Sequence, residues 1–91
     1  MHDILTTMNK YELNVVIDSK ATPAKKKAVT EKITKMVDLA KGKVTKMEDF
    51  GDKKYGIVLL FVLELGPEAA KGLVTKVRQD EDVIKQLMIK I

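Results

Sequence analysis

Apolar and polar residues alternate along residues 10–18, and this period of two is typical of a β-strand with one buried face. The apolar row comprises Tyr11, Leu13, Val15 and Ile17. The alternation breaks at residues 19–22. Thr22 then precedes Pro23, and this pair predicts a helix start, because threonine caps a helix well and proline suits its first position.

The predicted helix runs from Pro23 to about Lys41. Its apolar residues recur at intervals of three and four, as on one buried helix face, and they are Val29, Ile33, Met36, Val37 and Ala40. Lys25, Lys26 and Lys27 fall off this stripe and are expected to form a solvated face. Gly42 is predicted to supply the left-handed residue that ends the helix.

A second, more polar strand is predicted over residues 43–50. The spacing of Val44 and Met47 breaks strict alternation, so a bulge is expected there. Residues 51–54, Gly-Asp-Lys-Lys, have the composition of a hairpin turn. A third, strongly apolar strand follows at about residues 56–65.

Gly66 and Pro67 predict the start of a second helix, and Glu68 is well placed against the positive end of its dipole. The apolar stripe of this helix consists of Ala70, Leu73, Val74 and Val77. Residues 80–82 are all acidic and are expected to form a solvated turn. Residues 83–91 form the last predicted strand.

The element order β-α-β-β-α-β predicts an α+β, ferredoxin-like fold, with a four-stranded antiparallel sheet and two helices on one face. Each crossover is expected to skip a strand, so the sheet order differs from the chain order. A chain of 91 residues has room for one core. We therefore predict a single domain over residues 10–91 and a flexible N-terminal extension over residues 1–9.

The third strand is apolar on both of its faces, although a sheet covered on one side should expose a polar face on the other. One row comprises Ile57, Leu59, Phe61, Leu63 and Leu65, and the other comprises Val58, Leu60 and Val62. Val16 and Met88 are predicted to extend the second row. Two interpretations are open. The second row, Val16, Val58, Leu60, Val62 and Met88, is a protein interface, or neighbouring long side chains shield it.

Residues that would support catalysis or metal binding are scarce. The absence of cysteine excludes disulfides, thiolate metal sites and cysteine nucleophiles. Ser19 is the only serine and has no histidine in a predicted element, so no Ser–His pair can form. The acidic residues 80–82 lack the spacing of a calcium loop. We predict no cofactor and no metal site.

One class of enzyme and one class of RNA-binding domain share the predicted element order. Acylphosphatases need a phosphate-cradling loop after the first strand, and residues 19–22 contain neither glycine nor arginine. RNA-recognition motifs stack bases on aromatic residues of the central strands, and Phe61 is assigned to the core-facing row. The sequence therefore predicts a protein that is not an enzyme and does not stack bases on its sheet.

The chain carries a net charge of +4, from 17 basic and 13 acidic residues. This excess is compatible with a polyanionic partner and does not identify one. The longest apolar run, residues 57–63, is too short to span a bilayer, so no membrane partner is expected.

Three strings in chain order carry a family resemblance. The first strand opens with Lys-Tyr-Glu-Leu at residues 10–13, the first helix exits through Gly-Lys-Val-Thr-Lys-Met-Glu-Asp-Phe-Gly at 42–51, and Asp-Glu-Asp-Val-Ile-Lys at 80–85 leads into the last strand. Together they resemble the bacterial small ribosomal subunit protein six family over nearly the whole of residues 10–91.

The chain departs from the family pattern after residue 51. The family continues with two basic residues, Leu-Ala-Tyr and a long hairpin, whereas Lys-Lys-Tyr-Gly-Ile at residues 53–57 leads directly into the apolar strand here. Either the leucine–alanine pair and the hairpin tip are missing, or residues 55–56 match the far side of that hairpin. In both alignments the second and third strands are expected to be shorter than in the family.

The resemblance implies a non-enzymatic assembly role in the cytoplasm, within the ribosome. Members of this family join small-subunit ribosomal protein eighteen and bind the central domain of small-subunit ribosomal RNA. Two other classes are open: a regulatory domain whose apolar face pairs with itself as a homo-oligomer, and an engineered scaffold that binds no RNA.

Candidate RNA contacts are mainly lysines, which suit phosphate positioning better than base readout. The phosphate candidates are Lys10, Lys53, Lys54, Arg78, Lys85 and Lys90. Tyr11 is a candidate for stacking or hydrogen bonding near the RNA, and its alternative role is ordinary packing under the last strand.

Overall fold

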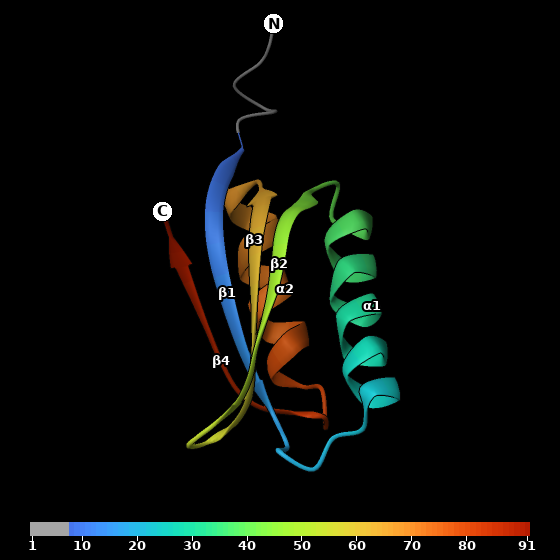
Figure 1. Ribbon diagram of the computed structural model, residues 1–91. Coiled ribbons are helices and arrows are strands. Elements are labelled where there is room, and N and C mark those ends of the chain that lie inside the picture. The colour runs from blue at the N-terminus through green and yellow to red at the C-terminus, as the bar shows by residue number, and fades with distance from the viewer. Residues whose placement is uncertain (1–7) are drawn as a thin grey trace, which may run out of the picture.

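The computed structural model describes residues 8–91, which form six elements in the predicted order (Figure 1). These are β1 (Asn9–Ile17), α1 (Pro23–Leu39), β2 (Lys43–Lys53), β3 (Gly56–Leu65), α2 (Pro67–Arg78) and β4 (Val83–Lys90). The sheet order is β2-β3-β1-β4, with antiparallel neighbours throughout. The predicted ferredoxin-like α+β fold is confirmed. The N-terminal extension predicted for residues 1–9 lies almost wholly outside the described residues.

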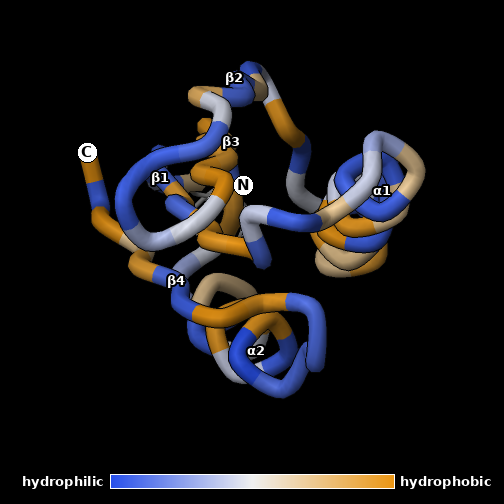
Figure 2. Tube along the Cα trace, turned by 60° about the horizontal axis from the view of Figure 1, so that its bottom comes forward, coloured by the Kyte–Doolittle hydropathy of each residue, from blue (hydrophilic) through white to orange (hydrophobic). Residues whose placement is uncertain are grey.

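The core lies between the two helices and one face of the sheet, which we call the helix face. Phe61 is its largest fully buried side chain, at the middle of β3. The expected rows of β1 and β3 supply the sheet side of the core, and the helices supply Val29, Ile33, Val37, Ala70, Leu73 and Val77. Figure 2 shows a nearly continuous hydrophobic trace along β3, the strand that is apolar on both faces.

Both helices begin as their sequences predict. The Thr22 hydroxyl oxygen accepts a hydrogen bond from the Lys25 backbone N–H at 3.1 Å, and Pro23 occupies the first turn of α1. This bond satisfies one of the N–H groups that a helix N-terminus leaves unpaired. In α2, Gly66 stands at the cap without a side-chain bond, and Glu68 is acidic in the first turn.

The end of α1 differs from the prediction. The left-handed residue is Lys41, with φ of 64°, and not Gly42. Gly42 has a different role, because a Cβ atom added there would overlap the Leu65 side chain and the Glu64 carbonyl oxygen. Glycine is required at this position since the start of β2 passes close against the end of β3.

The predicted irregularity of β2 is confirmed, because its register with β3 shifts between Val44 and Lys46 and again between Asp49 and Gly51. The predicted turn is misplaced. β2 continues to Lys53, and Gly51 lies within it at the second shift, with φ of 75°. The connecting turn is Lys54-Tyr55. A glycine at a bulge allows a left-handed backbone without steric cost.

Candidate functional site

The face of the sheet opposite the helices, the outer face, carries the second apolar row. The register places Val16 opposite Val58, while Leu60 and Val62 follow along β3 opposite Asn14 and Glu12. All four apolar side chains are half-buried. Val16, Val58, Leu60 and Val62 therefore lie together on one surface, as their alternation predicts.

The last strand extends this surface with residues that the sequence interpretation missed. Leu87 lies opposite Asn14 and Ile89 lies opposite Glu12. Their side chains are 57% and 46% exposed, respectively. We call the combined surface the outer patch, and it consists of Val16, Val58, Leu60, Val62, Leu87 and Ile89.

Met88 does not belong to the outer patch, which corrects the prediction. It lies opposite Leu13, a fully buried residue, and packs against the core on the helix face. Residues 87–89 are Leu-Met-Ile, so three successive apolar residues hide the period of two. Only pairing with β1 decides which of them faces outward.

Tyr11 also lies on the helix face, where its side chain is 8% exposed. Its hydroxyl oxygen accepts a hydrogen bond from the Asn9 side-chain amide at 3.2 Å. This burial favours the packing interpretation of Tyr11 and leaves no ring surface on which a base could stack.

The six cationic RNA candidates separate into two groups. Lys53 and Lys54 lie at the β2–β3 hairpin, and Arg78 and Lys85 line one hollow near the start of β4. Lys10 and Lys90 lie toward the other end of the sheet, near the Tyr11–Lys90 pairing. Lys10 and Val16 are six positions apart in β1, which corresponds to about 20 Å.

The hairpin turn brings an aromatic ring between two of these cations. Tyr55 is 69% exposed, and the ammonium nitrogens of Lys54 and Lys85 lie 5.8 Å and 5.5 Å from its ring centroid. Lys85 belongs to β4, at the opposite edge of the sheet from β2. The hairpin therefore bends across the end of β1, as Figure 1 shows. We call Lys53, Lys54, Tyr55, Arg78 and Lys85 the hairpin end.

The acidic turn between α2 and β4 is bound to α1 and is not simply solvated. The Lys32 ammonium lies 2.8 Å from the Asp80 carboxylate, whose side chain is only 7% exposed. Asp82 pairs with Lys25 at 3.1 Å and with Lys32 at 3.3 Å. These hydrogen-bonded lysines lower the pKa of Asp82, and Asp80 raises that of Lys32.

Lys26 forms a further ion pair, which links α1 to β2. Its ammonium lies 2.9 Å from the Asp49 carboxylate. The pKa of Asp49 is lowered, first by this lysine and then by the Gly51 backbone N–H, which Asp49 accepts at 2.7 Å. Lys25 and Lys26 are therefore surface lysines that pair with carboxylates of the fold.

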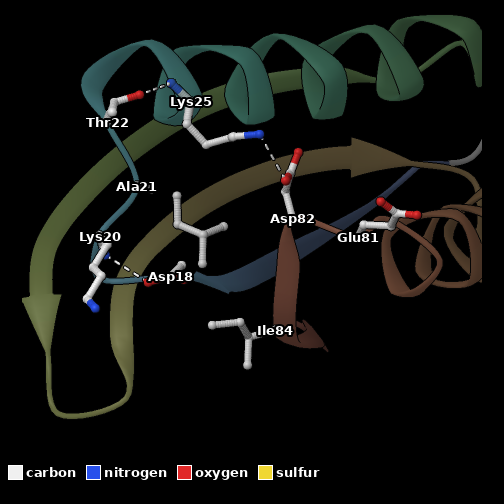
Figure 3. Close-up of a pocket in the computed structure, with 9 residues that line it drawn as sticks. Asp18, Lys20, Ala21, Thr22, Lys25, Glu81, Asp82 and Ile84 are labelled. Atoms are coloured by element: carbon white, nitrogen blue, oxygen red, sulfur yellow. Dashed lines mark hydrogen bonds and ion pairs between the residues drawn. The ribbon is translucent and has the colours of Figure 1, made fainter.

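A cavity of about 350 Å³ lies between the β1–α1 loop and the α2–β4 turn (Figure 3). Two backbone N–H groups of its loop are already used, because Lys20 N–H bonds the Asp18 carboxylate at 2.8 Å and Ala21 N–H bonds the Asp18 carbonyl at 2.9 Å. Lys25 is paired with Asp82 across it. The arrangement is typical of a structural junction and not of a phosphate cradle.

Residues 8–91 contain neither a metal-ligand cluster nor a membrane-spanning helix. No group of three or more histidine, cysteine or acidic side chains is placed to hold a metal ion in this part of the chain. None of the described helices is both long enough and apolar enough to cross a membrane.

The sequence profile of the family described as Ribosomal protein S6 matches residues 10–90. Among curated proteins, no sequence matches. Among solved structures, the 30S ribosomal protein S6 of Thermotoga maritima is similar at 18% identity and a TM-score of 0.81, covering 93% of this chain and 89% of that one.

Two further solved structures share the fold at lower similarity. The C-terminal domain of the MgtC protein of Mycobacterium tuberculosis is 14% identical, with a TM-score of 0.75, covering 92% of this chain and 88% of that one. The P2 domain of the chemotaxis kinase CheA of Thermotoga maritima, solved in complex with CheY, is 14% identical, with a TM-score of 0.67 and coverages of 93% and 100%. At these identities the likenesses establish the fold alone.

Proposed function

The chain belongs to the ribosomal protein S6 family, and we propose that it binds the central domain of small-subunit ribosomal RNA together with small-subunit ribosomal protein eighteen, in the cytoplasmic ribosome. The family is one of structural ribosomal proteins, so the role is assembly and not catalysis. The observation that carries the proposal is the outer patch, an apolar surface that no helix of the described chain covers.

The outer patch has the properties of a protein interface. It joins half-buried residues of the two central strands, Val16, Val58, Leu60 and Val62, to the more exposed Leu87 and Ile89 of β4. Asn14 and Glu12 of β1 lie between its β3 and β4 parts, so the outer patch combines two apolar rows with two polar side chains. Charged and polar groups border it, since Glu48 lies opposite Leu60 and Lys46 lies opposite Val62. Apolar side chains interspersed with polar ones are typical of a docking surface between proteins that also exist apart.

The hairpin end supplies the RNA chemistry of the proposal. Lys53, Lys54 and Lys85 gather beside one edge of the outer patch, and none of the three forms an ion pair with residues 8–91. By contrast, Lys25, Lys26 and Lys32 are held by carboxylates of the fold. Cations that the fold leaves unpaired are available to phosphates. Lys10 and Lys90 lie at the opposite end on different faces of the sheet, since Lys90 is opposite Tyr11 of the helix face, and each would contact a separate stretch of RNA.

The protein interface is tested by placing a carboxylate in the outer patch. Leu87→Asp should weaken binding to protein eighteen at least tenfold in a calorimetric titration, because the complex would bury an unpaired charge. Leu60→Asp should act in the same direction, and circular dichroism must show that it folds. Leu39→Asp is the matched control, since Leu39 is 73% exposed at the end of α1, in the helix layer. Equal affinities for the Leu87 and Leu39 variants would reject the outer patch.

The same surface favours one other candidate function, self-association. A second copy of the chain could cover the outer patch as well as protein eighteen does. Sedimentation of the chain alone distinguishes the two. A concentration-dependent dimer that Leu87→Asp abolishes, with no RNA affinity at low salt, would favour the regulatory domain over the ribosomal role.

A further inference from the structure

We propose that Tyr55 is a stacking platform for one unpaired nucleobase, and that Lys54 and Lys85 hold the phosphates that flank this base. The inference rests on the proposed function, because it assigns a specific contact with RNA to the hairpin end. The ligand is single-stranded nucleic acid, bound through one base as well as through its phosphates.

The exposure of Tyr55 sets it apart from the other aromatic residues. The chain contains two tyrosines and two phenylalanines. Phe61 is fully buried and Tyr11 is 8% exposed, whereas Phe50 is 44% and Tyr55 is 69% exposed. Tyr55 contributes little to the core, because it occupies a two-residue turn at the tip of a hairpin. A large ring that remains open to solvent has both apolar area and a π-face to offer a ligand.

The surroundings of the ring match a nucleotide more closely than an apolar partner. Lys54 and Lys85 approach the ring from two elements, at 5.8 Å and 5.5 Å from its centroid. Cation–π contacts at an exposed site are weak, so these two can restrain the ring and still yield to a stronger contact. Lysine stems are flexible, so each ammonium can move from the ring to a phosphate when a base replaces it.

Stacking on one aromatic side chain within a basic groove is a recurrent mode of single-strand binding, and it tolerates any base because every base has a π-face. Phe61, the aromatic residue of the central strand β3, is unavailable for this mode, since it is buried on the helix face. The hairpin turn provides an alternative platform at the end of the sheet. Its position beside Val16 and Val58 would place the stacked base at the border of the outer patch.

The test uses the intrinsic fluorescence of Tyr55. The chain has no tryptophan, so Tyr11→Phe leaves Tyr55 as the only fluorescent tyrosine. Titration of this variant at low salt with single-stranded oligouridylate should quench the tyrosine emission. An abasic oligomer of the same length, which retains the phosphates and lacks the bases, should bind with less affinity and leave the emission unchanged. Equal quenching by both oligomers, or no quenching by oligouridylate, would overturn the proposal.

Substitution of the ring provides an independent measurement. Tyr55→Leu should lower oligouridylate affinity by about 5- to 150-fold, the range that corresponds to stacking contributions of 1–3 kcal/mol. The salt dependence of binding should stay unchanged, since no cation is removed, and Tyr55→Phe should bind nearly as the parent does. Unaltered affinity in Tyr55→Leu would refute the platform while leaving the ribosomal role intact. A change in Tyr55 emission caused by protein eighteen without RNA would assign the ring to the protein interface and also refute it.

Discussion

The Lys85 ammonium lies 5.5 Å from the centre of the Tyr55 ring, although Lys85 belongs to the edge strand β4 and Tyr55 to the turn that leaves β2. This contact crosses the end of β1 and holds the hairpin over the outer face. It brings Lys54 and Lys85, from distant parts of the chain, to one end of the sheet, where both are available to RNA phosphates.

Removing the hairpin cations should weaken the salt dependence of RNA binding. The Lys53→Ala, Lys54→Ala double variant is expected to reduce the slope of log K against log salt by about 1.4–1.8, because each lost phosphate contact contributes roughly 0.7–0.9. The measurement is a filter-binding or fluorescence titration over a salt series. Lys27→Ala with Lys35→Ala, on the exposed side of α1, removes the same charge and should change the slope less. An unchanged slope in the hairpin variant would remove the turn from the RNA site.

Gly42 should not tolerate a side chain. Gly42→Ala is expected to destabilise the fold by about 1–3 kcal/mol, the usual cost of forcing a methyl group into a packed site. The new Cβ would overlap Leu65 and the Glu64 carbonyl. Gly72→Ala is the matched control, since its Cβ would meet no atom within 4 Å in the middle of α2, and it should stabilise by up to about 1 kcal/mol. Urea unfolding measures both, and equal midpoints for the two variants would contradict the close approach of β2 to β3.

The two phenylalanines should differ sharply in their contribution to stability. Phe61→Ala should cost about 3–5 kcal/mol, as expected for removal of a fully buried aromatic side chain. Phe50→Ala, at a position that is 44% exposed, should cost much less. Chemical unfolding of the two variants provides the comparison. A comparable loss at Phe50 would mean that the bulged end of β2 contributes to the core.

Stability should fall in acid through the paired carboxylates. The pKa of Asp82 lies below its ordinary value of 3.8 because Lys25 and Lys32 stabilise the charged form. A lowered pKa contributes stability that is present above pH 3.8 and is lost as the pH falls through the folded-state value. The Asp82→Asn variant should therefore unfold at lower urea than the parent near pH 6, and the difference should shrink below pH 3.8.

The control for this titration is Asp38→Asn, because Asp38 is exposed on α1 and forms no ion pair within residues 8–91. It should not reproduce the acid-dependent difference. Lys32 affects stability at alkaline pH. Its raised pKa contributes stability below pH 10.5, and this stability is lost as the pH rises through the folded-state value. A parent-to-Asp82→Asn difference that is constant from pH 6 to pH 3 would show that the ion pair contributes nothing.

The elements and the core could be predicted from the sequence because local patterns determine them. Alternation in β1, the Thr22-Pro23 start of α1 and the double apolar row of β3 each involve residues close in the chain. The face of Met88 could not be predicted, since Leu87 and Ile89 are also apolar and pairing with β1 decides the register. The local signal for the outward row is the spacing of Leu87, Ile89 and Ile91 by two residues, and the apolar Met88 between them obscures it.

The roles of Gly42, Asp80 and Tyr55 depend on contacts between segments that are distant in the sequence. Gly42 meets the end of β3, Asp80 meets Lys32 of α1, and Tyr55 meets Lys85 of β4. A local pattern contains no information about such approaches. For this reason the sequence around Gly42 resembles a helix cap, residues 80–82 resemble a solvated turn, and no local pattern marks Tyr55 as an RNA contact.

The ribosomal role is tested most directly by binding of labelled central-domain small-subunit RNA, with and without protein eighteen, across a salt series. Our proposal predicts that the chain binds tightly only when protein eighteen is present, and that affinity falls steeply as salt increases. Absence of binding in both conditions at low salt would contradict the proposed function and leave only the membership of the family.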